Sequence, residues 1–159
     1  MEHKKISYLL IGAGVLAALG GGFLFFIDAP MAALRYRSAL PELSYLMIPG
    51  LVFLWFIGIL YGTAMINYFL ICVRIGKNRS FSRENASGLS RIAALLLGAG
   101  LIWLLGIPFG LLLRLRLGVW SLAFLLAAAA SAAMGALAWG LAKLLRRAVE
   151  MKEENDLTV

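Results

Sequence analysis

Four long runs of apolar residues, separated by short polar stretches, make up most of the chain. They cover residues 6–27, 46–73, 92–113 and 119–141 and contain no Asp, Glu, Lys, Arg or His. Because an α-helix rises about 1.5 Å per residue, about 20 residues cross a hydrocarbon core roughly 30 Å thick. Lipid offers the backbone no hydrogen bonds, so each run must be helical, and the alternation typical of a barrel strand is absent. The pattern predicts an all-α polytopic membrane protein, with four transmembrane helices packed as a four-helix bundle in a single membrane domain, residues 1–159.

The composition supports a membrane protein, and the charges suggest its orientation. The chain is 62% hydrophobic and 14% charged, too apolar for an ordinary soluble domain. Of fifteen basic residues, eleven lie at the N-terminus, in the loop 74–91 or in the tail 142–159. The other four are Arg35, Arg37, Arg114 and Arg116. The positive-inside rule therefore predicts that both termini, the loop and the tail are cytoplasmic. The net charge of +7 follows from this asymmetry, and no helix-turn-helix or aromatic-interleaved pattern indicates direct nucleic-acid binding.

The stretch 28–45, between the first two runs, contains Pro30 and Pro41. Prolines mark turns and loops, so we expect a short connector on the outer face. Its Ala-rich and Leu-containing pieces could also lie flat on the outer leaflet.

Small residues recur at a spacing of four inside the runs. At this period they let helix backbones approach closely, which is how helices in lipid gain packing energy. Thr63 and Asn67 share one face and are expected to hydrogen-bond to a neighbouring helix. We expect these residues to pack within the chain, and a homodimer is the alternative. The helix-packing candidates are Gly58, Gly62, Thr63, Asn67, Gly106, Gly110, Ser131 and Gly135.

The side chains that carry most enzyme chemistry are scarce. The chain has one histidine, His3, and one cysteine, Cys72, so no metal-ligand spacing exists. A nucleophile would lack a histidine base near the membrane domain, and no P-loop or dinucleotide fingerprint is present. The sequence therefore predicts a non-enzymatic protein without a metal or cofactor.

The loop 74–91 and the tail 142–159 carry the remaining polar residues. Ser82 has the character of a helix N-cap with Glu84 in the first turn, so the third helix should begin before the membrane does. Phe81 and Leu89 would then point toward lipid or a partner. Acidic residues of the tail oppose the basic loop in charge, and we expect the two segments to dock. A simpler alternative is an interfacial elbow, in which the arginines attract anionic lipid and Phe81 dips into the interface.

A family resemblance rests on these two segments. Gly76, Phe81-Ser82, Asn85, Leu89 and Ile92, followed after two spans by Glu154-Asn155-Asp156-Leu157-Thr158-Val159, resemble small bacterial four-helix membrane proteins catalogued as "domain of unknown function 2975". The chain departs from the family at Arg79-Ser80, where a proline often stands before the Phe, which bears on the tight turn there. The resemblance implies a bacterial cytoplasmic membrane. Members are frequently encoded beside a small Cro-type helix-turn-helix regulator, which suggests a membrane-bound regulatory partner.

The leading hypothesis is a regulatory membrane anchor whose loop and tail bind a partner such as a small transcriptional regulator. The alternatives are a transporter or channel-like subunit for small apolar molecules or lipids, and a structural accessory subunit of a membrane complex. The partner-binding candidates are Phe81, Ser82, Asn85, Leu89, Glu154, Asp156, Leu157 and Val159.

Overall fold

The computed structural model describes residues 2–39, 41–112 and 118–157, which are helical apart from the link 77–82 between two long helices. Four stretches are long and apolar enough to cross a membrane, so the chain is a multi-pass membrane protein by helix length and composition. Arg114 and Arg116 lie outside the described residues. In order, the elements are α1 (Glu2–Phe23), the π-helical turn η1 (Leu24–Asp28), α2 (Ala29–Ala39), the 3-10 helix η2 (Pro41–Leu46), α3 (Met47–Gly76), α4 (Arg83–Leu112) and α5 (Gly118–Leu157).

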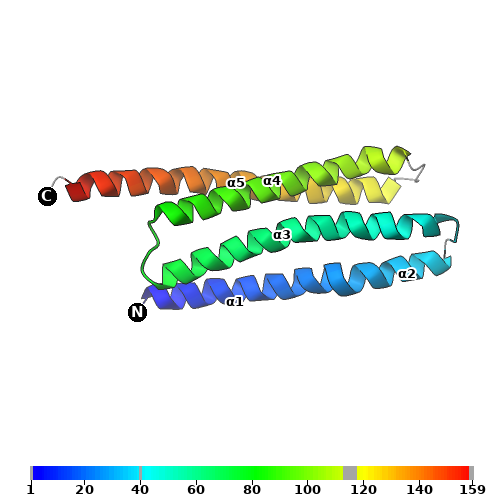
Figure 1. The fold of residues 1–159 in the computed structure, drawn as a ribbon, viewed down its shortest axis with the longest axis horizontal. Coiled ribbons are helices and arrows are strands. Elements are labelled where there is room, and N and C mark those ends of the chain that lie inside the picture. The colour runs from blue at the N-terminus through cyan, green and yellow to red at the C-terminus, as the bar shows by residue number, and fades with distance from the viewer. Residues whose placement is uncertain (1, 40, 113–117, 158–159) are drawn as a thin grey trace.

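The stretch 28–45 joins the first two spans, but its described residues are helical where a loop was expected, because α1, η1 and α2 follow one another as a single helical rod (Figure 1). A π-turn absorbs Pro30: the N–H of Ala29 donates to the carbonyl of Leu24, five residues back. At the same spacing of five residues, the carbonyl of Phe25 would accept from residue 30. Pro30 has no N–H, so this donor is missing. Trp55 of α3 supplies the missing donor, with 3.2 Å between its Nε1 and the Phe25 oxygen. The helix therefore passes the proline with its backbone satisfied.

The long helices form an open row, with each one packed on the next. Figure 1 shows α1 beside α3, α3 beside α4, and α4 crossing α5, with both termini and the link 77–82 at one end. Over the described ranges, α1 does not approach α4 or α5 closely enough to close a ring. The expected four-helix bundle is therefore replaced by two helical hairpins that meet where α3 packs on α4.

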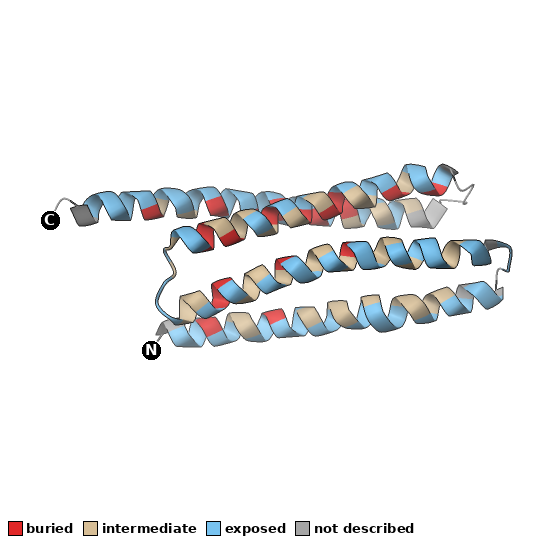
Figure 2. Cartoon of the chain, in the orientation of Figure 1, coloured by how far each residue is buried: buried red, intermediate tan, exposed pale blue. Residues whose placement is uncertain are grey.

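Burial is concentrated in the second hairpin (Figure 2). Within the most apolar window of each span, 28% of residues are buried in α4 and 22% in α5, against 6% in each of the first two spans. Small residues explain the difference, because a Cβ atom added to Gly135 would lie 2.8 Å from Cγ of Leu97, and one added to Gly100 would lie 3.2 Å from the Ala128 carbonyl oxygen. The outward faces of α1 and α3 carry many exposed large apolar side chains, which suits contact with lipid.

Three helices are joined by a chain of hydrogen bonds midway along the second hairpin. Trp103 of α4 donates from Nε1 to the hydroxyl of Tyr61 on α3, at 3.1 Å. The Tyr61 hydroxyl also lies 2.5 Å from Oγ of Ser131 on α5. Ser131 was a helix-packing candidate, but Tyr61 and Trp103 were not recognised in the sequence as its partners. These polar groups are used to hold α3, α4 and α5 together.

The other helix-packing candidates divide into two groups. Gly58 and Gly106 lie against aromatic rings, since added Cβ atoms would be 3.3 Å from Phe25 and 3.0 Å from Phe53, and Gly110 is buried. Gly62 has no neighbour within 4 Å of such an atom, so the structure gives it no packing role within the chain.

The hydrogen bonds expected from α3 to a neighbouring helix are also wrong. The Thr63 hydroxyl donates to the Ile59 carbonyl at 2.8 Å, and the Asn67 amide donates to the Thr63 carbonyl at 2.9 Å, both within α3. A carbonyl one turn back lies within reach of a short polar side chain, and this local bond satisfies the side chain without a partner helix.

Candidate interaction site

The link between α3 and α4 begins with a defined helix cap. Asn78 adopts a left-handed conformation, with φ of 61°. Its N–H donates to the Ile75 carbonyl, and the N–H of Arg79 donates to the Arg74 carbonyl, both at 3.0 Å. This pair of bonds is a Schellman motif, and asparagine is one of the few residues that adopts the left-handed position readily. The tight turn is therefore present without the proline that the family often has.

Gly76, at the end of α3, lies against the first helix. A Cβ atom added to Gly76 would be 2.7 Å from Oγ of Ser7, which is itself buried and donates to the Cys72 carbonyl at 2.8 Å. The glycine is needed because the start of α1 passes so closely beneath the link. Ser7 was not recognised in the sequence, since a lone serine in an apolar run has no distinguishing pattern.

The start of α4 confirms the predicted N-cap. Oγ of Ser82 accepts from the backbone N–H of Asn85 at 3.2 Å, which is the bond that defines an N-cap serine. Glu84 lies in the first turn, where a negative charge is favoured by the helix dipole. Residues 83–91 are therefore helical, and the predicted loop 74–91 shortens to the link 77–82.

Asn85, in the first turn of α4, holds the link in place with its side chain. Its side-chain amide Nδ2 donates to the carbonyls of Arg79 and Ser80, at 2.9 and 3.1 Å. The residue is only 1% exposed, and its Oδ1 atom is buried without a hydrogen-bond partner. Asn85 was a partner-binding candidate, and the structure corrects this: the side chain is used inside the protein to fix the two carbonyls of the link.

Loop and tail dock through an ion pair, as predicted from their opposite charges. Arg83, the first residue of α4, donates from Nε and Nη2 to the two carboxylate oxygens of Glu153 on α5, the first of these at 3.0 Å. Glu153 lies beyond the apolar part of α5, and hydrogen bonding to Arg83 lowers the pKa of its carboxyl. This bidentate geometry is the most specific that a carboxylate can form with a basic side chain.

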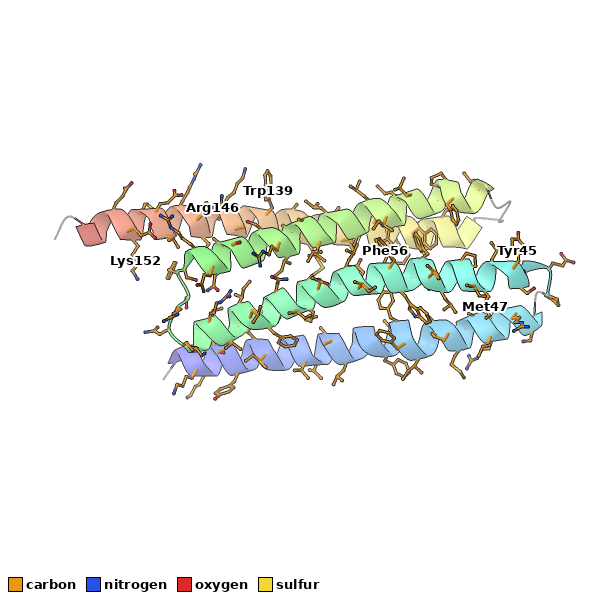
Figure 3. All side chains as sticks on the ribbon, in the orientation of Figure 1. Tyr45, Met47, Phe56, Trp139, Arg146 and Lys152 are labelled. Carbon is orange, nitrogen blue, oxygen red and sulfur yellow. The ribbon has the colours of Figure 1, made fainter. Side chains whose placement is uncertain are left out.

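A hollow of about 410 Å³ lies beside this ion pair, between the link and the tail. Phe81 stands at its wall with 62% of its surface exposed. Figure 3 shows Lys152 on the side of α5 toward the start of α4, whereas Arg146 and Trp139 project from the other side. The hollow is lined by Arg79, Phe81, Ser82, Arg83, Glu84, Val149, Lys152 and Glu153.

The remaining partner-binding candidates are not among the described residues that line the hollow. Leu89 is half-buried on α4, and Glu154 is exposed on α5 next to the ion pair. Val159 and the side chains of Asp156 and Leu157 lie outside the described residues. The structure thus brings together Phe81, Ser82 and the tail, and adds Arg79, Val149 and Lys152 to the surface.

Residues 31–159 match the family described as "Protein of unknown function (DUF2975)". The match runs from α2 to the end of the chain, so it includes the link, the tail and every residue that lines the hollow. No curated protein and no solved structure matches the chain.

Proposed function

We propose that the protein, which belongs to the DUF2975 family, is a non-enzymatic regulatory anchor that holds a protein partner at the membrane surface. The binding surface is the hollow between the link and the tail, here called the Phe81 hollow. A small helix-turn-helix regulator is the partner that the family resemblance suggests. Holding such a regulator at the membrane would keep it away from DNA.

The observation that carries this proposal is the exposure of Phe81 beside the hollow between the link and the tail. Large aromatic side chains that project next to a concave surface are typical anchors of protein interfaces. The walls are fixed by the Asn85 amide bonds on one side and by the Arg83–Glu153 ion pair on the other. The Asn85 bonds order the link side of this surface before a partner binds, which reduces the entropy cost of binding.

The charge around Phe81 indicates the chemistry of the partner. Arg83 and Glu153 neutralise each other, while Arg79 and Lys152 add two positive charges against the one negative charge of Glu84, which leaves a net charge of +1 on the hollow. A complementary surface would present an apolar side chain to Phe81 with acidic residues at its edge, since opposite charges at a rim speed association and select partners.

The proposed surface is cytoplasmic. The link, the tail and both termini lie at the same end of the molecule (Figure 1), and this end carries eleven of the fifteen basic residues. The positive-inside rule places that end in the cytoplasm, which in a bacterium means the inner face of the cytoplasmic membrane.

The test compares two apolar truncations at the same end of the protein. Phe81→Ala removes the proposed anchor, and Met151→Ala removes a similarly exposed side chain, 64% exposed, that does not line the hollow. Binding of a small Cro-type helix-turn-helix regulator, of the kind encoded beside family members, is measured by biolayer interferometry on full-length protein in nanodiscs. We expect Phe81→Ala to weaken binding about tenfold or more, as for an interface hot spot, and Met151→Ala to change it less than twofold.

Two outcomes would reject the proposal. Equal affinities for the wild type and Phe81→Ala would show that the hollow is not the binding surface. If Phe81→Ala instead changed only how deeply the link sits in the bilayer, measured by quenching from brominated lipid, the interfacial elbow would be the correct interpretation.

A further inference from the structure

A second hollow, also of about 410 Å³, opens between α3 and α4. Three arginines line it: Arg74 from the last turn of α3, and Arg83 and Arg91 from the first part of α4. Arg74 pairs with Glu84, the one carboxylate in the lining, and Arg83 pairs with Glu153, so Arg91 is the lining charge that no described carboxylate neutralises. The volume is within the range of about 300–1,000 Å³ that small-molecule sites occupy. The residues of this arginine hollow are drawn from two helices that both continue into the apolar region.

The guanidinium groups retain donors for a further anion. Arg74 contacts Glu84 through its Nε atom, at 3.3 Å from Oε2, which leaves its two Nη groups uncommitted in the described part of the chain. Arg91 is exposed and makes no ion pair with any described carboxylate. Ser87, one turn before Arg91 on the same face of α4, adds a hydroxyl to the lining. Several N–H and O–H donors around one cavity suit a phosphate oxyanion, which guanidinium groups bind in a bidentate manner.

The faces below the arginine hollow are apolar and exposed. Leu70 lines the hollow itself and is 48% exposed, and Ile59 and Phe56 continue the same face of α3 at 65% and 55% exposure. On α4, the face that carries Ser87 and Arg91 continues through Leu101 and Leu105, which are 63% and 65% exposed. Ile59 and Leu70 are eleven residues apart, and Ser87 and Leu105 are eighteen apart, which is close to three and five helical turns, so each set lies on one side of its helix. A charged hollow at the end of two apolar strips matches an amphiphile with a negative head.

We infer that the arginine hollow binds the phosphate headgroup of an anionic phospholipid, with the acyl chains lying along the exposed faces of α3 and α4. Basic pockets between membrane helices on the cytoplasmic side are suited to such headgroups. Free phosphate shares the headgroup chemistry, but it would make no use of the apolar strips. The two hollows share Arg83 and Glu84, so the inference is tested on Arg74 and Arg91, which line the arginine hollow and not the Phe81 hollow.

The test measures lipid binding to full-length protein in detergent by native mass spectrometry. Phosphatidylglycerol and phosphatidylcholine with the same acyl chains are titrated against the wild type, Arg91→Gln and Arg147→Gln. Arg147 is an exposed arginine of α5 outside the hollow, so its substitution removes the same charge elsewhere. We expect the wild type to prefer phosphatidylglycerol, and we expect Arg91→Gln to weaken that lipid about fivefold or more while Arg147→Gln changes it less than twofold. Arg74→Gln gives a second variant with the same expectation, and circular dichroism checks that each variant is helical.

Three results would overturn the inference. Equal losses in Arg91→Gln and Arg147→Gln would show general surface attraction in place of a site. Unchanged affinity in both Arg91→Gln and Arg74→Gln would show that the lipid binds elsewhere. Displacement of the bound lipid by inorganic phosphate at an equal concentration would assign the site to a soluble anion. None of these results bears on partner binding, since the regulator assay uses Phe81→Ala.

Discussion

Replacing Asn85 by alanine should loosen the link between α3 and α4 while the membrane helices stay folded. The substitution removes both Nδ2 bonds, to the carbonyls of Arg79 and Ser80. A side-chain hydrogen bond contributes about 0.5–1.5 kcal/mol net, so the two together contribute about 1–3 kcal/mol. Loss of the unpaired Oδ1 atom offsets part of this, because that buried acceptor is itself destabilising. The expected cost to the closed link is therefore about 1–2 kcal/mol.

This cost should make the link between α3 and α4 open more often. Since about 1.4 kcal/mol corresponds to a factor of ten, the open fraction of the link should rise about 5- to 30-fold. Hydrogen exchange in nanodiscs measures it, because the backbone N–H groups of Arg79, Asn85 and Ala86 form the helix-cap bonds at the two ends of the link and exchange when these bonds open. Peptides that cover residues 77–90 should exchange faster, and peptides from α5 within the membrane should not change.

Ser90→Ala provides the matched control. The Ser90 hydroxyl donates at 3.0 Å to the Ala86 carbonyl within α4 and makes no contact with the link that would be lost. Exchange in the link should therefore stay within about twofold of the wild type, because a bond inside one helix contributes little to link closure. If Asn85→Ala and Ser90→Ala gave the same exchange rates, the amide of Asn85 would not be what holds the link, and the reasoning would fail.

Three further predictions concern other contacts of the fold. Trp55→Phe should destabilise the first hairpin by about 1–2 kcal/mol, because it leaves the Phe25 carbonyl unpaired in lipid; a thermal midpoint in detergent equal to that of the wild type would contradict this. Tyr61→Phe should cost about 1 kcal/mol by removing the hydroxyl that joins three helices, and the same thermal assay should show no loss if that hydroxyl is unimportant. The pairing of Arg83 with Glu153 should persist as the pH falls through the ordinary carboxyl range and be lost only as it passes the lowered pKa of Glu153, because the charged form is favoured in the folded protein. Spin-label distances between link and tail would measure it, with Glu153→Gln expected to resemble the acidic state at neutral pH.

The membrane helices could be predicted from the sequence because the charge-free runs leave the backbone no alternative to a helix. Ser82 was equally accessible, since an N-cap depends on a local pattern of a few residues. The docking of loop and tail followed from their opposite charges, although only the structure identifies Arg83 and Glu153 as the pair.

The remaining contacts depend on three-dimensional neighbours that no local pattern specifies. Asn85 looks the same in sequence whether its amide faces a partner or, as found, the carbonyls of Arg79 and Ser80. Trp55 donates to the Phe25 carbonyl, which is thirty residues away in sequence. No local pattern shows this bond, so Pro30 alone suggested a loop. For the same reason Tyr61 and Trp103 were not linked to Ser131, because aromatic residues in apolar runs are common.

The length of α5 has a mechanical consequence. From Lys143 to Leu157 this helix continues past its apolar part without interruption, a rise of about 22 Å at about 1.5 Å per residue. A rigid rod of that length acts as a lever: a change of about 10° in its tilt would move the far end by about 4 Å. Glu153 is near that end and is held to Arg83 by a bond of 3.0 Å, so such a tilt is enough to break or make the contact. Because a long membrane helix adjusts to bilayer thickness by tilting, a change in thickness would thereby be coupled to this contact outside the membrane.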